Sequence, residues 1–561
     1  MNIDISQIGY RWKGIYSANL SYAENDVVYK DGGAYVIRSN VPVPFALGQQ
    51  DAAVKGHLLT GGLSAGGFGN MVLHSDGATV EFRFQDTRNG TLAVQLARSD
   101  QQASSRGTYD SAMAIMQDRS VRSWGFQGAG GTGTGTAAIG RTLPHRVPFP
   151  PGTPHIVDIL RFWDETFYLD AAGTVWHSGA NSNSVGGYGT TTDQPIPRKV
   201  NGNGDLGTDT KIAKLTGRMD YYDYRGAGFI DDAGRVYVTG SNVSSRLGLG
   251  ATVTDVNVPR LIPLTETVPM KDMFFACTNN GATWLLSRTG QLYACGEANT
   301  SGRGGGNSVT HELWMPWGET NTVKEVVHTT SDHHWVAAAQ YPRTTTALLD
   351  NGDLYMWANS AGQVGGGYGT GYVGEVLPST ASTLHPYKVN EGVVTAASKS
   401  GGYHTSLCLM DDGSIQHSGS SSQSAAIAPV NVTTWTTLDP TVFNNGTKLL
   451  MQGGQQVATA SLLRSDGQLI MWGDGQGGRL GIGYDGDSSW TPGNSTYPQP
   501  IKLEKTVVDF QPVGNSTADT TAAGMQILTS DGGVYFVGTG NSSVNGDDDG
   551  QYSAVPRQII F

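Results

Sequence analysis

One short cassette recurs eight times between Ala112 and Phe561, and this repeat limits the fold more than any other feature. Each copy reads as an apolar run, a turn of the Asp-Gly or Asn-Gly type, a second apolar run that often holds Tyr or Trp, a glycine, and a polar glycine-rich loop. The copies begin at Ala112, Thr166, Gly228, Thr283, Ala347, Ser406, Ser461 and Met525; their turns are anchored at Ser120, Gly173, Gly234, Gly290, Gly352, Gly413, Gly467 and Gly532. Successive anchors lie 53 to 65 residues apart.

A period near sixty residues is too long for one coil of a β-solenoid and suits a four-stranded propeller blade with long loops. Runs such as "VVDFQPV" and "KIAKLTG" precede most copies and supply a further strand for each unit. We therefore predict an all-β fold, a β-propeller of four-stranded blades with a small N-terminal β-module. Eight blades are expected, with seven as the alternative. The Asp-Gly and Asn-Gly pairs predict two-residue turns of type I′.

The stretch "LIMWGDGQGGRLGIG", Leu469 to Gly483, could be a phosphate-binding loop or a set of turns. A phosphate loop requires a helix directly after the glycines, and the polar, proline-broken residues that follow do not predict one. The glycines are therefore expected at turns and bulges, where a Cβ atom would clash.

Composition excludes several classes of protein. Glycine accounts for 78 of 561 residues, about twice its ordinary share, which indicates many tight turns. A net charge of −12 argues against DNA or nucleosome binding, since nucleic-acid surfaces are basic. There is no run of 18 apolar residues and no signal peptide at the start, so no membrane insertion is expected. Cys277, Cys295 and Cys408 are expected to be buried thiols of a protein folded in reducing cytosol.

The cassette resembles the repeat of the regulator of chromosome condensation (RCC1) family of β-propellers over roughly residues 91–561. The match is specific at Asp466-Gly467, Trp472-Gly473, Gly478, Leu480-Gly481 and Gly483, and Arg246 to Gly250 repeats it. The Trp position departs from the pattern, where we align Val238, Cys295 and His417 with it. The resemblance implies nucleotide exchange on a small nuclear GTPase with chromatin docking. We set that activity aside because the acidic chain lacks the basic surface it would need.

The N-terminal residues differ in kind from the repeats. Residues 10–40 are similar to a small chitin-binding type module that also occurs near the ends of bacteriophage tail and fibre proteins. We expect residues 1–45 to form this carbohydrate-binding-like β-module, 46–90 a linker and hairpin, and 91–561 the propeller. The hairpin within 46–90 either closes the ring or belongs to the front module. The aromatic residues that could stack on a sugar are Trp12, Tyr16, Tyr22, Tyr29 and Tyr35, although so small a module also needs such rings in its core.

No catalytic or metal-binding constellation is predicted. His333 and His334 are adjacent, so on a strand they would point to opposite faces, and no third ligand is evident. The acidic runs at Asp485 and Asp487 and at Asp547 to Asp549 lack the spacing of a calcium loop. We expect no cofactor, no metal and no enzymatic activity.

Together these features predict a bacteriophage virion protein of the tail or fibre type that contributes to attachment to the host surface. The expected partners are other virion proteins, further copies of this chain, and a host polysaccharide or protein receptor, with no nucleic acid; the expected location is the virion, assembled in host cytoplasm. Loop aromatic residues that could contact a receptor are Tyr188, Trp314, Trp317, Tyr368 and Tyr484. The alternatives are a purely structural decoration protein and a polysaccharide depolymerase.

Overall fold

The computed structural model describes the chain in segments and divides it into two compact units, Met1–Leu92 and Ala93–Phe561. The described residues are 2–4, 11–15, 26–30, 33–36, 70–73, 79–83, 92–99, 111–125, 129–135, 141–161, 164–216, 219–221, 224–275, 282–296, 311–316, 335–341, 344–349, 351–358, 387–399, 405–419, 432–452, 459–473, 475, 478–482, 495–513, 524–538 and 553–561.

The first unit contains two three-stranded sheets. One has the order β1 (Asn2–Asp4), β6 (Thr79–Arg83), β5 (Asn70–Leu73), and the other the order β2 (Arg11–Ile15), β3 (Asp26–Lys30), β4 (Gly33–Val36). The hairpin β5–β6 therefore pairs with the start of the chain and does not close the ring.

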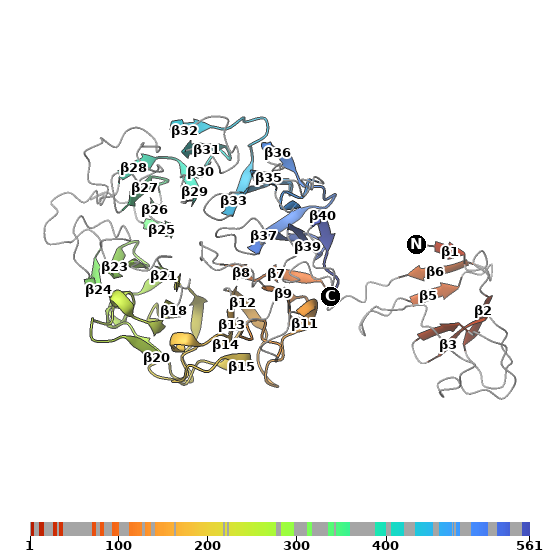
Figure 1. The fold of residues 1–561 in the computed structure, drawn as a ribbon, viewed down its shortest axis with the longest axis horizontal. Coiled ribbons are helices and arrows are strands. Elements are labelled where there is room, and N and C mark those ends of the chain that lie inside the picture. Colours follow the sequence, from red (N-terminus) through yellow and green to blue (C-terminus); the bar gives the residue numbers. More distant parts are fainter. Residues whose placement is uncertain are drawn as a thin grey trace, which may run out of the picture. The chain divides into compact units, whose positions relative to one another are not determined.

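The second unit is built from eight sheets arranged around a centre, as Figure 1 shows. Blade 1 holds β7 (Ala93–Leu96), β9 (Ser111–Met116), β10 (Val121–Gly125) and β11 (Arg141–Arg146), and blade 2 holds β12 (Ile156–Arg161), β13 (Glu165–Asp170), β14 (Val175–Gly179) and β15 (Gln194–Lys199). Blade 3 holds β16 (Ile212–Leu215), β18 (Tyr224–Asp231), β19 (Val236–Ser241) and β20 (Asp255–Leu261), and blade 4 holds β21 (Met270–Phe275), β22 (Ala282–Ser287), β23 (Leu292–Gly296) and β24 (His311–Pro316).

The remaining four blades follow in chain order. Blade 5 holds β25 (Trp335–Tyr341), β26 (Thr344–Leu349), β27 (Leu354–Ala358) and β28 (Tyr387–Asn390), and blade 6 holds β29 (Val393–Lys399), β30 (Thr405–Met410), β31 (Ile415–Gly419) and β32 (Val432–Thr437). Blade 7 holds β33 (Gly446–Gln452), β34 (Thr459–Arg464), β35 (Leu469–Gly473) and β36 (Ser495–Pro500), and blade 8 holds β37 (Val507–Val513), β38 (Gly524–Thr529), β39 (Val534–Gly538) and β40 (Ser553–Gln558).

Short elements supplement the blades. β8 (Arg98–Ser99) pairs in parallel with β12, and β17 (Met219–Tyr221) pairs with β18. Three 3-10 helices, η2 (Ser182–Ser184), η3 (Val243–Ser245) and η4 (Pro263–Glu266), are the helical elements of the described residues. The prediction of an all-β propeller with eight four-stranded blades is confirmed, and each predicted hairpin forms the second and third strands of a blade.

The hairpin turns differ from the predicted type I′. In blade 2, Gly173 N donates to Asp170 O at 2.9 Å and Asp170 N donates to Thr174 O at 3.0 Å; Gly173 has φ +85° while Ala172 keeps a negative φ. This is a type I turn followed by one left-handed residue, the three-residue hairpin loop with a bulge. The corresponding amide-to-carbonyl bond closes the turn in all eight blades. One glycine per turn is therefore enough.

Blade 1 fills that left-handed position with Arg119 (φ +65°), one residue before the predicted anchor Ser120. A side chain with a Cβ atom is disfavoured there by about 1 kcal/mol. We expect Arg119→Gly to raise the free energy of unfolding by roughly 0.5–1 kcal/mol, which urea denaturation measures. Arg119→Ala is the matched control because it removes the same charge and keeps the strain. An equal gain in both variants would contradict this explanation.

The described glycine-rich loops of blades 2 and 7 contact the next blade closely. Gly478 (φ +73°) lies where an added Cβ would meet the Ala554 Cα of blade 8 at 2.7 Å. In the same way the loop of blade 2 accepts a hydrogen bond at Val185 O from Thr239 Oγ1 of blade 3, at 2.5 Å. The expectation that the glycines of "LIMWGDGQGGRLGIG" are required at close approaches and turns is thus confirmed for the described glycines Gly478 and Gly481, both of which have a positive φ and a neighbouring blade-8 atom close to the position of an added Cβ.

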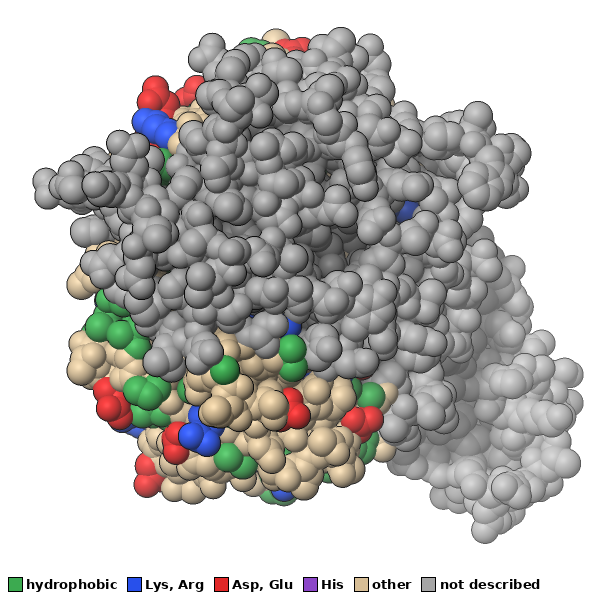
Figure 2. Space-filling view, turned by 60° about the vertical axis from the view of Figure 1, so that its left-hand side comes forward, with side chains coloured by type: hydrophobic (Ala, Val, Ile, Leu, Met, Phe, Trp, Pro, Cys, Tyr) green, Lys and Arg blue, Asp and Glu red, His purple; other side chains and the backbone are tan. Residues whose placement is uncertain are grey.

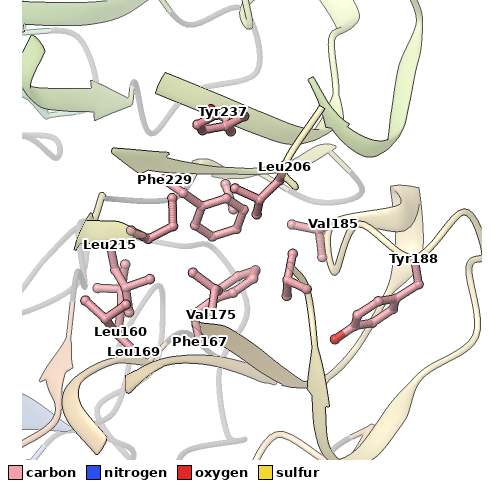
Figure 3. Packing of buried hydrophobic residues seen from close by; sticks show 13 residues of the cluster. Leu160, Phe167, Leu169, Val175, Val185, Tyr188, Leu206, Leu215, Phe229 and Tyr237 are labelled. Atoms are coloured by element: carbon pink, nitrogen blue, oxygen red, sulfur yellow. The ribbon is translucent and has the colours of Figure 1, made fainter. Parts of the chain in front are cut away.

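The core consists of apolar clusters between neighbouring blades. Figure 3 shows one of them, where Phe167 and Leu160 of blade 2 pack with Phe229 and Leu215 of blade 3, and the rings of Phe167 and Phe229 meet edge to face at 5.4 Å. Successive residues of a strand point to opposite faces of its blade. Because each blade is covered on both faces, one strand contributes side chains to the clusters on both sides.

Ring closure uses the same packing and no shared strand. Blade 8 and blade 1 together bury a cluster that includes Val513, Phe536 and Trp124. Trp124 meets Phe561 edge to face at 5.5 Å, and Ala93 N donates to Gly532 O at 2.9 Å.

The register of the third strands corrects our alignment of the Trp position. Trp124 and Trp472 directly precede the strand-ending glycines Gly125 and Gly473. Thr239, Cys295 and Ser418 hold the same position in blades 3, 4 and 6. Val238 and His417 therefore lie one residue earlier than the Trp position.

Candidate binding surface of the ring

Antiparallel strand order gives the ring two faces. The turn face carries the hairpin turns between second and third strands and the connections that enter each new blade; the loop face carries the glycine-rich loops. The first strand of each blade is innermost (Figure 1). Backbone bonds join its start to the preceding turn, as where Val507 N donates to Gly467 O at 2.8 Å.

Every innermost strand carries a β-bulge at its second residue. The bulge leaves this residue out of the ladder and directs its side chain to solvent. Val94, Val157, Val394 and Val508 occupy the position in blades 1, 2, 6 and 8, and they are 57%, 41%, 54% and 48% exposed. We call these four residues the bulge valines. Three of them lie on the consecutive blades 8, 1 and 2.

The third residue of the innermost strand is half-buried in the seven blades whose side chains are described there, and several of these residues pair across strands. Lys214 Nζ lies 2.5 Å from Asp272 Oδ2, joining blades 3 and 4, and Lys448 Nζ lies 2.5 Å from Asp509 Oδ1, joining blades 7 and 8. Arg98 pairs with Asp158 of blade 2. Asp158 and Asp509, which follow the bulge valines Val157 and Val508 directly, are thus each paired with a basic side chain.

Exposed carboxylates mark the turn face in blade 6 and in the connection to blade 7. Ser414 N donates to Asp412 Oδ1, and Thr441 Oγ1 and N donate to Asp439 Oδ1. The side-chain hydroxyl of Ser414 lowers the pKa of Asp412, and that of Thr441 lowers the pKa of Asp439. Both groups therefore stay ionised at neutral pH. On the face in Figure 2, charged side chains of the described residues are scattered among uncharged ones.

A buried ion cluster joins blades 2 and 3 toward the loop face. Arg225 at the start of β18 makes two hydrogen bonds to Asp164, at 2.9 and 2.8 Å, and one to Glu165 Oε2 at 3.3 Å. The side chains are 6%, 10% and 0% exposed. Because all three are shielded from water, the cluster holds two blades together and offers no open site.

Tyr188 is the one residue, among the ten predicted to contact a ligand, whose side chain the structure describes. It is 7% exposed, its hydroxyl lies 3.1 Å from His177 Nδ1, and the Arg198 guanidinium lies 4.4 Å from its ring centre. Burial raises the pKa of Tyr188 well above its usual value. The structure thus gives Tyr188 a packing role. Trp12, Tyr29, Tyr35 and Trp314 lie in strands β2, β3, β4 and β24, and the described residues do not include Tyr16, Tyr22, Trp317, Tyr368 or Tyr484. Sugar contact by these nine residues stays a prediction.

Within the described segments no group of three or more His, Cys, Asp or Glu side chains could hold a metal ion. The candidates His333, His334, Asp485, Asp487 and Asp547 to Asp549 lie outside those segments. The described cysteines, Cys295 and Cys408, are buried free thiols. None of the helices in these segments has the length and apolar character needed to cross a membrane.

Sequence comparison finds relatives of the RCC1 kind. The chain is 26% identical over 302 residues to RCC1 domain-containing protein RUG3, mitochondrial, of Arabidopsis thaliana, which covers 52% of this chain and 60% of that protein. It is 31% identical over 132 residues to the X-linked retinitis pigmentosa GTPase regulator of Canis lupus familiaris, covering 23% of this chain and 12% of that protein. The chain spans less than two thirds of the length of these curated relatives. No protein-family model matches it.

Two solved structures superpose on this chain over most of its length. Human WBSCR16 superposes with a TM-score of 0.49 at 17% identity, covering 73% of this chain and 100% of that one. Prp20p from Saccharomyces cerevisiae, described with its binding to Gsp1p and histones, superposes with a TM-score of 0.47 at 18% identity, covering 78% of this chain and 95% of that one.

The sequence relatives establish that the chain carries RCC1-like propeller repeats, and they overturn the predicted function. They are proteins of a plant and of mammals, so the prediction of a bacteriophage tail or fibre protein is wrong, as are its two alternatives. The predicted virion partners, the host receptor and the virion location are wrong for the same reason. The relatives are named as a domain protein and as a GTPase regulator, and neither name describes a catalyst of covalent chemistry.

Proposed function

We propose that this RCC1-like propeller is a regulatory protein that acts by binding a partner protein on its turn face, and that a small GTPase is the partner class. The observation that carries the proposal is the 26% identity to RUG3 over 302 residues, together with the similarity to a GTPase regulator. Propellers present rigid faces built from many loops, and a site on such a face decides function more than the fold does.

The bulge valines are the residues that we assign to this contact. Apolar side chains near the centre of an interface contribute most when water is excluded around them, and charged groups are depleted there. Val508, Val94 and Val157 lie on neighbouring innermost strands and expose about half of their surface. The exposed carboxylates Asp411, Asp412 and Asp439 lie in the hairpin turn of blade 6 and in the connection to blade 7, and would meet a partner at its rim.

The experiment measures binding of the full chain to a panel of purified small GTPases and the release of fluorescent GDP from each. We expect one GTPase to bind, and Val508→Asp to weaken that binding at least tenfold, because a carboxylate would be desolvated at the centre of the contact. Val555→Asp is the matched control, since Val555 lies on the outermost strand of the same blade and is 39% exposed. It should bind within twofold of the wild type.

Two outcomes would contradict the proposal separately. Absence of binding and of accelerated GDP release across the panel would remove the GTPase as partner. If Val508→Asp and Val555→Asp weaken GTPase binding equally, or if neither weakens it, the turn face is not the binding site. We further propose that the unit Met1–Leu92 is a separate module, for which the chitin-binding resemblance stays a prediction.

A further inference from the structure

His417 lies in an unusual place for a polar side chain. It belongs to β31, the third strand of blade 6, and is 0% exposed. Neither Nδ1 nor Nε2 has a hydrogen-bond partner among the described residues. In the strand ladder His417 lies opposite Leu407, and Ile415 two residues earlier lies opposite Leu409, so all four side chains share one face of the blade.

That face packs against blade 7. The cluster between the two blades joins Leu407, Leu409, Ile415, Leu438 and Phe443 to Leu449, Ala460, Leu462, Ile470 and Trp472. Among these ten cluster residues, the indole N–H of Trp472 is the one polar side-chain group, and it too lacks a partner among the described residues. Among the described residues, the face of blade 6 that carries His417 and the surface of blade 7 that packs on it are therefore apolar.

The charged and titratable groups of the surrounding elements are engaged elsewhere. Cys408 on β30 faces blade 5, Lys448 on β33 pairs with Asp509, and Arg464 on β34 pairs with Asp466. Asp439 in the connection to blade 7 is exposed and accepts from Thr441. Gln416 and Thr436, beside His417 in the sheet, carry no charge. Burial alone lowers the pKa of His417 to about 4, with no opposing charge contribution.

Blade 2 provides an internal comparison. His177 occupies the same register position, two residues before the strand-ending glycine Gly179, and is equally buried. Its Nδ1 lies 3.1 Å from the Tyr188 hydroxyl, and its ring packs on Phe167 at 4.7 Å between ring centres. The glycine-rich loop of blade 2 thus supplies a partner to its histidine, and His417 has none in the described part of blade 6.

We propose that the interface between blades 6 and 7 is an acid-sensitive seam of the ring, which opens when His417 takes up a proton. An imidazolium carries two N–H donors and a full charge, and an apolar interface satisfies neither. Admission of water between the blades relieves that cost. A ring held by successive interfaces opens first where one of them is weakened, and the turns of blades 6 and 7 then separate.

The direction with pH follows from the difference between the folded and unfolded histidine. The closed interface keeps His417 neutral, so closure is fully favoured above the ordinary pKa of 6.5 and is lost progressively as the pH falls from 6.5 toward 4. Between pH 7.5 and pH 5, the opening equilibrium of this interface should rise roughly 30-fold.

Native-state hydrogen exchange of the full chain at pH 7.5 and pH 5.0, corrected for intrinsic exchange rates, tests the proposal. We expect strands β31, β34 and β35 to lose protection roughly 30-fold beyond that correction, while β13 and β14 around His177 keep theirs. In His417→Leu the pH-dependent loss should disappear. His417→Met, which fills a similar volume flexibly, serves if the Leu variant does not fold.

Each remaining outcome overturns the proposal. Unchanged protection of β31 and β35 at pH 5.0 would show that proton uptake does not open the interface. An equal loss in wild type and in the folded His417 variant would assign the effect to another group. If neither variant folds, NMR titration of the wild-type histidines decides, since a His417 that titrates near its ordinary pKa with native protection intact contradicts the seam.

Discussion

Replacing Gly240 by Ala is expected to lower the free energy of unfolding by about 4 kcal/mol. Gly240 ends the third strand of blade 3 with φ +101°, a backbone conformation that side chains rarely adopt. An added Cβ would also press on the Arg225 carbonyl oxygen and lie 2.8 Å from the Gly226 Cα. Neither obstacle is a flexible side-chain end, so the paired strands themselves would have to separate.

Substitution of Gly250 separates the cost of backbone strain from the cost of steric contact. Its φ is +90°, and no heavy atom lies within 4 Å of the Cβ that Ala would add. Gly250→Ala should therefore cost about 1–2 kcal/mol from backbone strain alone. Urea denaturation of both variants measures the difference. Equal losses would show that the close approach of strand β18 at Gly240 contributes nothing.

Arg225→Met is the second substitution for which we expect a large effect, a loss of about 3–5 kcal/mol. It leaves the carboxylates of Asp164 and Glu165 buried between blades 2 and 3 without the guanidinium that holds both. Met keeps much of the volume, so the loss reports the charge imbalance more than a cavity. Thermal and urea unfolding of the full chain measure it.

The exposed pair Lys505 and Asp531 provides the control for Arg225. Their side chains are 42% and 51% exposed, and surface pairs contribute about 0–1 kcal/mol. Lys505→Met should thus lose less than 1 kcal/mol. A similar small loss for Arg225→Met would mean that water reaches the cluster and that it does not hold the two blades together.

The repeat predicted the ring because each cassette contains its own strand, turn and strand signals. The hairpins around Gly173 and Gly467 appear where the sequence places them. The turn type was mistaken because Asp-Gly is compatible with two hairpin geometries, and the chain length between the paired strands decides between them. The placement of Ser120 as an anchor failed because Arg119 adopts a conformation that its residue type does not suggest.

The binding surface was missed for a different reason. The bulge valines read as ordinary strand residues in "VVDF" and "VVTA", since two successive β-branched residues also suit a strand covered on both faces. The signal that could have found them is the recurrence of Val at the second position of the innermost strand in several blades. Tyr188 was mistaken for a loop contact because its hydrogen bonds to His177 and Arg198 come from the fold.

The functional prediction was wrong because the acidic net charge was taken to exclude the activity that the RCC1 resemblance implies. A net charge of −12 disfavours a nucleic-acid surface, but it says little about a protein partner, whose contact depends on local side chains. The activity set aside on that ground is the one nearest to the GTPase regulator among the relatives. The five aromatic residues of the front module carried the virion interpretation, and aromatic rings alone do not separate packing from binding.

The most direct test of the central claim is an experimental structure of the full chain by electron cryomicroscopy. The ring described here predicts eight four-stranded blades, with blade 8 packed on blade 1 through Phe561 and Trp124 and no strand shared between them. A ring of seven blades with one cassette outside it, or a gap between the Val513 and Trp124 sides of that cluster, would contradict it.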